Sequence, residues 1–493
     1  MSRSTPPARL LPILAFTLLG FAAMGYHPGA EDDGVYLAAV KANLVSALFP
    51  HDSDFFRLQL QATVFDGWMA RFVDMSHIPL VWAELLWQFL ALLLILWACH
   101  SIASRLFAER RSQWAAVALV SAMLTLPVAG TALSLADQYL HPRNLATAAV
   151  LMAVARILAG KSWQAWPLLI LAMLLHPIMG ALGCSFCFFL MMATLEPARA
   201  RAAAQVVGTY AACLVPLGWI FEPPSATWRQ ALETRTYYFL YKWTWYEWLG
   251  ALAPLFLFWL LWRVANKRGE KTLARFSLAV FAYGAFQQIV AIAMLTPPAF
   301  IRLTPFQPMR FLHLVYFFLC LAAGGLLGKY VLEARVWRWT VFLLVANGDM
   351  FLVQRELFAN TEHLELPHVH TANEWLQAFD WIRQNTPQNA YVALDPWYMR
   401  APGEDYHSFR ALAERSVLAD IVKDAAVVTQ VPRLGPAWQE QTAAAEGWTH
   451  FQLADFERLK SQFGVDWVVV AYPAPAGLTC PWHNGLLTVC RIP

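Results

Sequence analysis

The stretch His27-Pro28-Gly29-Ala30-Glu31-Asp32-Asp33-Gly34 places three adjacent carboxylates directly after an apolar segment that covers residues 10–26. Its proline and glycine end a helix and turn the chain. Like charges this close raise the pKa of at least one member, which suits a general base or a metal ligand. Capping of the next helix accounts for one acidic residue, but three exceed what a cap needs. We therefore take Glu31, Asp32 and Asp33 as candidate catalytic residues.

The composition around this motif is that of a membrane protein. Of the 493 residues, 58% are hydrophobic and only 14% are charged, against about 25% charged in soluble domains. This excludes a purely soluble globule and a mainly disordered chain. Residues 1–352 hold 26 basic and 17 acidic side chains, net +9, whereas residues 353–493 hold 10 and 16, net −6. The basic residues form no dense patch, so we expect no nucleic-acid partner.

The apolar runs predict a mainly α-helical, polytopic transmembrane bundle over residues 1–352, followed by an extracytoplasmic α/β domain over residues 353–493. A helix needs about 20 mostly apolar residues to cross the hydrocarbon core. The runs predict about eleven spans, near residues 10–26, 79–99, 114–133, 145–160, 164–178, 180–195, 203–221, 245–262, 275–295, 311–328 and 337–352.

The basic residues predict the orientation of these spans. With the N-terminus in the cytoplasm, the inner segments hold 17 of the 26 basic residues of the membrane part. Basic residues are enriched on the cytoplasmic side, and an odd number of spans then places residues 353–493 outside. We thus expect a multi-pass protein of the inner (cytoplasmic) membrane. In the oxidising exterior, Cys480 and Cys490 are expected to form a disulfide.

The first outer loop, residues 27–78, is the most informative segment. A helix is expected from about Gly34, and a second over residues 54–76, both with apolar residues on one side. Such patterns suit helices that lie in the membrane interface, where they would roof a cavity formed by the spans.

Basic residues recur at the outer mouths of the spans. Arg143 and Arg310 each lie beside a proline or histidine with few nearby acids, which suits a phosphate group that arginine binds bidentately. Interfacial snorkelling is the simpler interpretation for a lysine in an aromatic-rich loop. The candidate lipid-phosphate ligands are Arg143, Arg310, Arg302, His141 and Lys242.

The C-terminal part has the pattern of a soluble α/β domain. Helices are predicted over residues 373–384 and 451–463, and strands over residues 390–394, 465–470 and 486–490. The last strand follows Asn484-Gly485, a typical hairpin turn. No catalytic constellation is evident in this part of the sequence.

The layout resembles the GT-C superfamily of membrane glycosyltransferases, which includes oligosaccharyltransferases. The matching features are the acidic motif Glu31-Asp32-Asp33, two interfacial helices after it, about eleven spans and a C-terminal soluble domain. The chain is also similar to bacterial membrane proteins of unassigned function that share the His-Pro-Gly-x-Glu-Asp start and the stretch Trp381 to Pro387. The second likeness brings no known activity.

The GT-C resemblance implies glycosyl transfer from a polyprenyl-phosphate sugar donor at the outer face of the bilayer. Asp32 or Asp33 would take the proton of an acceptor, and Arg143 and Arg310 would stabilise the departing lipid phosphate. The acceptor, whether glycan, lipid or protein, stays open. Members differ in whether they use a metal, so Mg²⁺ or Mn²⁺ held by the carboxylates also stays open.

Two alternatives stand beside the transferase. A transporter or flippase for a lipid-linked glycan would place its site near mid-depth, where Glu84 is the foremost candidate. A non-catalytic structural membrane protein is the third possibility. Charge at the span mouths outweighs charge at depth, which favours the enzyme.

Overall fold

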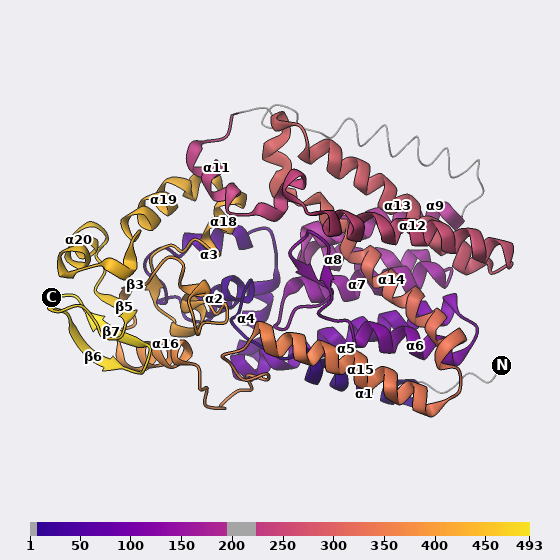
Figure 1. Ribbon diagram of the computed structural model, residues 1–493, viewed down its shortest axis with the longest axis horizontal. Coiled ribbons are helices and arrows are strands. Elements are labelled where there is room, and N and C mark those ends of the chain that lie inside the picture. Colours follow the sequence, from indigo (N-terminus) through magenta and orange to yellow (C-terminus); the bar gives the residue numbers. More distant parts are fainter. Residues whose placement is uncertain (1–6, 195–222) are drawn as a thin grey trace.

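The computed structural model describes residues 7–194 and 223–493. It consists of a long helical body and a smaller α/β body, which carries the C-terminus at the left of the view (Figure 1). The last long helix of the helical body ends at Leu357.

The helical body contains several of the apolar helices that the sequence predicts. Six described stretches are long and apolar enough to cross a membrane: Leu80–Leu106 (α5), Pro177–Thr194 (α9), Trp245–Lys267 (α12), Lys271–Leu295 (α13), Pro308–Leu332, which includes α14 (Leu312–Leu327), and Val336–Leu357 (α15). Shorter helices are α1 (Pro7–Met24), α7 (Pro142–Leu158), α8 (Ala165–Leu175) and α11 (Ala226–Glu233). The count of about eleven spans is not confirmed, and the predicted span 203–221 lies outside the described residues.

The predicted span 114–133 is wrong. Helix α6 (Arg110–Ser121) ends early, and the chain then forms a hairpin of β1 (Pro127–Val128) and β2 (Leu133–Ser134). The residue before a proline avoids the helical region, so Pro127 helps to end the helix. The segment is apolar because it is buried in protein. Helix α6 packs closely on α14, where a Cβ on Gly324 would lie 2.6 Å from a backbone oxygen of α6.

The loop after the first helix holds three helices: α2 (Asp33–Leu44), α3 (Asp54–Leu60) and α4 (Phe65–Ser76). The single helix expected over residues 54–76 is broken because Thr63 and Val64 donate hydrogen bonds to the last carbonyls of α8. Helix α2 is not the amphipathic surface helix expected. Nine of its twelve residues are buried, and it packs against α4 and the α/β body.

The α/β body is a five-stranded mixed sheet with helices on both faces. The strands are β3 (Tyr391–Ala393), β4 (Ser416–Val417), β5 (Trp467–Ala471), β6 (Thr479–His483) and β7 (Leu487–Arg491), in the order β4-β3-β5-β7-β6. The helices are α16 (Glu374–Asn385), α17 (Phe409–Ala413), α18 (Asp424–Gln430), α19 (Gly435–Ala444) and α20 (Leu453–Phe463). Every helix and strand predicted for this part is present.

Alternating side chains of the central strand make two apolar layers. Val469 packs with Phe379 of α16 on one face, whereas Val468 and Val470 pack with Phe456 of α20 on the other. The hairpin β6–β7 closes the sheet, and Cys480 is bonded to Cys490 across it.

Candidate functional site

A cavity of about 800 Å³ lies where the helical body, the acidic loop and the α/β body meet. Its walls include Glu31 and Asp32 of the loop, His141 and Arg143 at the start of α7, and Arg310 just before α14. Five of the predicted site residues are thus brought together from three distant parts of the sequence. The first loop contributes Glu31, Asp32, Val35 and Tyr36 to these walls.

The three adjacent carboxylates of the loop do not share one environment. Asp33 is 1% exposed and turned away from the cavity, and its Oδ2 accepts the backbone N–H of Gly29 at 2.6 Å. Burial raises the pKa of Asp33. Glu31 and Asp32 instead keep side-chain exposures of 37% and 42%, because they face the cavity. Asp33 therefore holds the turn, and the other two acids are available to a ligand.

Lys423, at the start of α18, is the cation that faces these two acids. Its Nζ lies 2.9 Å from Asp32 Oδ1 and also contacts Glu31 Oε2. Burial favours the neutral form of Asp32, but the charges of Lys423 and of the cavity residues His141 and Arg143 outweigh it, so the pKa of Asp32 falls far below its usual range. Asp32 is therefore ionised at every physiological pH.

The backbone of the acidic loop is held by the α/β body. The N–H of Glu31 donates to Tyr406 O at 2.8 Å, and the N–H of Ser408 donates to Gly29 O at 2.9 Å. Glu31 has a φ of 51°, in the left-handed region that side chains adopt only where the surroundings impose it. The α/β body thus sets the direction in which the acidic side chains point.

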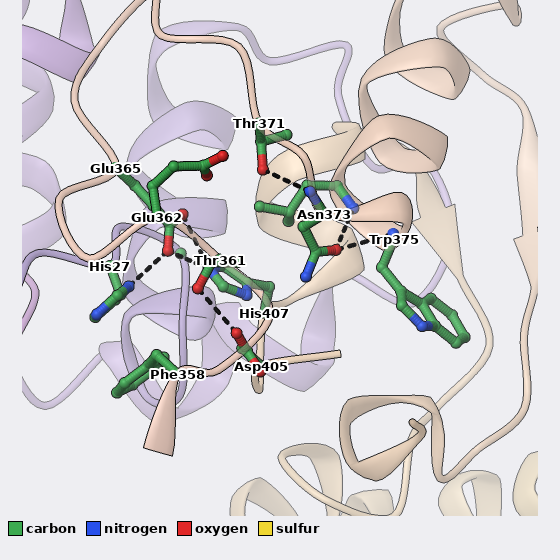
Figure 2. A network of polar contacts seen from close by, with 12 residues as sticks. His27, Phe358, Thr361, Glu362, Glu365, Thr371, Asn373, Trp375, Asp405 and His407 are labelled. Atoms are coloured by element: carbon green, nitrogen blue, oxygen red, sulfur yellow. Dashed lines mark hydrogen bonds and ion pairs between the residues drawn. The ribbon is translucent and has the colours of Figure 1, made fainter. Parts of the chain in front are cut away.

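Beside the loop, a buried ionic junction ties the two bodies together (Figure 2). Glu365 Oε1 lies 2.6 Å from His27 Nδ1, and both Glu365 oxygens lie 3.1 Å from His407 Nε2. A second carboxylate, Glu404, lies 3.6 Å from His407 Nδ1. His27 lies three residues after the end of α1, Glu365 lies in the connection between the bodies, and His407 pairs with Ala30 in an isolated β-bridge. The junction therefore anchors the acidic loop at its start.

Arg143 is not the open phosphate ligand that its sequence neighbours indicate. It is 3% exposed, and its guanidinium binds both oxygens of Asp137, with Nε 3.1 Å from Oδ2. The expectation of few nearby acids was wrong, because the turn after β2 returns Asp137 to the start of α7. Arg143 still reaches the cavity wall, but its charge is balanced.

Arg310 is a cavity cation that keeps its charge unpaired. It lies in a short 3₁₀ turn (Pro308–Phe311) before α14, and its Nε is buried without a hydrogen-bond partner. Within residues 7–194 and 223–493, no ion pair neutralises its guanidinium. A partly buried guanidinium without a counter-charge is costly unless an anion binds it. Arg310 is therefore a position in this cavity that suits a phosphate.

Two other predicted phosphate ligands lie outside the cavity. Arg302 lines a neighbouring pocket of about 670 Å³ together with Arg433, and it donates to Pro223 O at 3.1 Å. Lys242 is exposed, with its Nζ 5.0 Å from the centre of the Phe239 ring. The position of Lys242 fits the interfacial alternative.

The carboxylates present do not fit a divalent cation as they are arranged. Mg²⁺ and Mn²⁺ need several oxygen ligands around one point. The ammonium of Lys423 lies between Glu31 and Asp32, and the other two acids near the cavity are bound to Gly29 N–H and to Arg143. In the part of the chain that the structure describes, no group of three or more His, Cys, Asp or Glu residues is placed to hold a metal.

Glu84, the candidate of the transporter alternative, is 4% exposed within α5. Its charge interacts with those of Asp33 and Lys41 of the loop. It does not line the cavity. This position makes Glu84 a neighbour of the buried side of the loop.

No protein-family model matches the chain, and no curated protein matches it. Among solved structures, the chain is similar to an archaeal oligosaccharyltransferase, AglB from Archaeoglobus fulgidus, in complex with an inhibitory peptide and a dolichol-phosphate. The identity is 13%, the TM-score is 0.45, and the match covers 94% of this chain and 69% of that one. The chain is also similar to a crystal structure of the Archaeoglobus fulgidus oligosaccharyltransferase in complex with Zn and sulfate. The identity there is 12%, the TM-score is 0.47, and the match covers 93% of this chain and 68% of that one.

These likenesses concern the overall course of the chain alone. At this identity they assign no residue and no activity. The six apolar helices of the described residues are those of a multi-pass membrane protein, and its chemistry must be argued from its own cavity.

Proposed function

We propose that the chain transfers a glycosyl group from a polyprenyl-phosphate-linked sugar to an acceptor at the outer face of the membrane. The observation that carries the proposal is that one cavity has both an ionised carboxylate, Asp32, and a cation without an ion pair, Arg310, on its walls. A carboxylate suits an acceptor that must lose a proton, and a guanidinium suits a leaving phosphate.

In this reaction the acceptor oxygen or nitrogen forms a bond to the anomeric carbon of the sugar. The bond between that carbon and the phosphate oxygen breaks, and its electron pair leaves with the lipid phosphate. Arg310 stabilises the negative charge that develops on the phosphate. Asp32 first accepts a hydrogen bond from the acceptor and then takes its proton.

The low pKa of Asp32 determines when that proton moves. A carboxylate this weakly basic does not deprotonate a free hydroxyl. The acceptor proton becomes acidic only as the new bond to the sugar forms, so the transfer to Asp32 comes late. Before that point, Asp32 orients the acceptor through the oxygen that Lys423 does not contact.

The lipid part of the donor would lie against the apolar part of the cavity wall. Leu175 of α8, Ile178 of α9 and Leu357 of α15 line this side. They belong to apolar helices of the membrane body, so a polyprenyl chain could pass from the cavity into the bilayer between them.

Exchange of single carboxylates tests the proposal. Asp32→Asn should abolish transfer in envelope membranes of the native host while leaving the amount of folded protein unchanged, because asparagine keeps the size but does not accept the proton. Asp33→Asn should instead retain transfer and lower stability by about 1–3 kcal/mol, since a buried hydrogen bond to Gly29 N–H is weakened.

The outcome that contradicts the proposal is equally specific. Full transfer by Asp32→Asn and by Glu31→Gln would end the assignment of this cavity as a transferase site. Glu84→Gln in α5 would then be the variant to examine for transport of the lipid-linked glycan.

The proposal requires the cavity to open outside the cytoplasm. A reporter that is active only outside, fused after Pro493, should work in the inner membrane. Mass analysis of the non-reduced protein should find Cys480 and Cys490 joined, since an oxidising compartment keeps such a bond. An inactive reporter or two free thiols would contradict the placement.

A further inference from the structure

We infer that Lys423 takes the place of a divalent cation at the Glu31–Asp32 pair, so that the α/β body completes the site and no added metal is needed. The activity part of this inference rests on the proposed function; the metal-binding part does not. Three sets of contacts carry it.

The first is the position of the ammonium itself. Nζ of Lys423 contacts one oxygen of Glu31 and one oxygen of Asp32, which is where a cation bridging two carboxylates would bind. Two adjacent carboxylates that face one cavity repel each other unless a positive charge lies between them. Lys423 supplies that charge from a residue 391 positions away from Asp32.

The second is the fixed backbone of Lys423. Its N–H donates to the carboxylate of Asp420, and the preceding carbonyl, Val422 O, accepts from Arg235. The residue is 9% exposed. A lysine on a flexible surface segment would give way to a metal ion, whereas this one is held in position on both sides.

The third set of contacts shows that the other carboxylates near the cavity already have partners. Asp33 accepts the N–H of Gly29, and Asp137 pairs with Arg143. Neither can join Glu31 and Asp32 around a metal without losing its present partner. The cavity thus holds two acidic ligands and one ammonium, where a magnesium or manganese site would need further oxygen ligands.

The inference predicts a gain of metal binding when the ammonium is removed. Full-length protein in nanodiscs is titrated with Mn²⁺, and the free ion is measured by electron paramagnetic resonance. Wild type should show no site that depends on Asp32. Lys423→Met should bind Mn²⁺ at least about tenfold more tightly than wild type, because a like charge beside a cation site costs several kcal/mol. Adding Asp32→Asn to that variant should remove the new site.

Two further variants serve as controls. Lys267→Met removes an exposed lysine at the end of α12 and should behave as wild type. Lys423→Arg keeps the charge and should not gain a site. If Lys423→Met does not fold, the comparison of wild type with Asp32→Asn decides the question, because any Mn²⁺ site lost on that exchange overturns the inference.

The activity measurement separates this inference from the proposed function. Transfer by wild type should survive chelation with EDTA, and transfer by Lys423→Met should fall at least about tenfold, as expected when one partner of a buried ion pair is removed. Loss of wild-type transfer on chelation, or failure of Lys423→Met to gain Mn²⁺ binding, would overturn the inference. A wild type without any transfer would count against the proposed function alone, since the metal titration is independent of transfer.

Discussion

Glu365→Gln should uncouple the two bodies of the protein. Glu365 is the carboxylate between His27 and His407, and its side chain is 12% exposed. Glutamine keeps the size of the side chain but removes the charge that both imidazoles face. The exchange leaves a buried His407 with only Glu404 as its acidic partner.

The structure gives the size of the effect. Burial lowers the pKa of His407, but Glu365, and after it Glu404, outweigh burial and raise the pKa from 6.5 to about 10. Each pKa unit corresponds to about 1.4 kcal/mol, so the net shift corresponds to about 5 kcal/mol, of which Glu365 supplies the larger part. Breaking a buried ion pair costs about 3–5 kcal/mol. We therefore expect Glu365→Gln to lower the free energy of unfolding by about 3–5 kcal/mol near pH 6.

The same values fix the pH dependence. A raised pKa of His407 stabilises the fold fully below pH 6.5, and this contribution is lost as the pH rises through about 10. Burial opposes the charged form of Glu365, but His407 and His27 outweigh burial and lower the pKa of Glu365 from 4.5 to about 2. The contribution of Glu365 to the free energy of unfolding is therefore complete above pH 4.5 and is lost as the pH falls through about 2. The difference between wild type and variant should thus be largest between pH 4.5 and 6.5.

The assay is thermal unfolding of the full-length protein in nanodiscs over a pH series. At pH 5.5 the midpoint of the variant should lie about 3–5 °C lower than that of wild type, because a chain of this size unfolds with an entropy of about 1 kcal/mol/K. Asp380→Asn is the matched control, because it removes an exposed carboxylate that pairs with Arg383, and such pairs contribute at most about 1 kcal/mol. Equal midpoints at pH 5.5, or an offset of the same size at pH 5.5 and pH 10, would refute the proposed coupling.

Two further exchanges test the cavity and the packing of the loop. Arg310→Ala should weaken the binding of a fluorescent polyprenyl-phosphate probe by about 1.5–3 kcal/mol, because a charge-assisted contact is lost. Arg302→Ala, in the neighbouring pocket, should leave the binding of the probe unchanged. Equal losses of affinity in the two variants would contradict the assignment of Arg310 as a phosphate ligand. Gly34→Ala should destabilise the protein by about 1–3 kcal/mol, because the new Cβ would lie 2.2 Å from Ser408 Cβ. Gly67→Ala, with no atom within 4 Å of its Cβ, is the control in thermal unfolding, and equal midpoints for the two alanine variants would show that α2 does not pack as described.

The sequence predicted the parts of the fold that depend on local pattern. The α/β body has a clear period of apolar residues, and the acidic motif is conspicuous beside an apolar helix. Hydropathy failed to distinguish segments that are buried inside the protein from segments that cross the membrane, because both consist mostly of apolar residues. The segment 114–133 is as apolar as a span, yet it forms a short helix and a hairpin inside the protein.

The site was predicted only in part, because its charges are paired over long sequence distances. Arg143 was chosen as a candidate because of the residues next to it in the sequence, and these residues do not indicate that Asp137 pairs with it. Lys423 was missed because one lysine at the start of a helix is unremarkable. The available signal was its setting: Lys423 interrupts a mostly apolar run between residues 416 and 428, which indicates a buried charge and hence a partner.

The arrangement of charges explains why the acidic loop and the α/β body depend on each other. Without the α/β body, Glu31 and Asp32 would face each other with no cation between them, and repulsion would favour protonation of one of them. The bonds from Tyr406 and Ser408 that hold the loop would also be absent. Because Asp32 must be ionised to orient an acceptor, a chain that ends near residue 353 should lose the proposed transfer even if its membrane helices fold. The α/β body is therefore part of the proposed catalytic site.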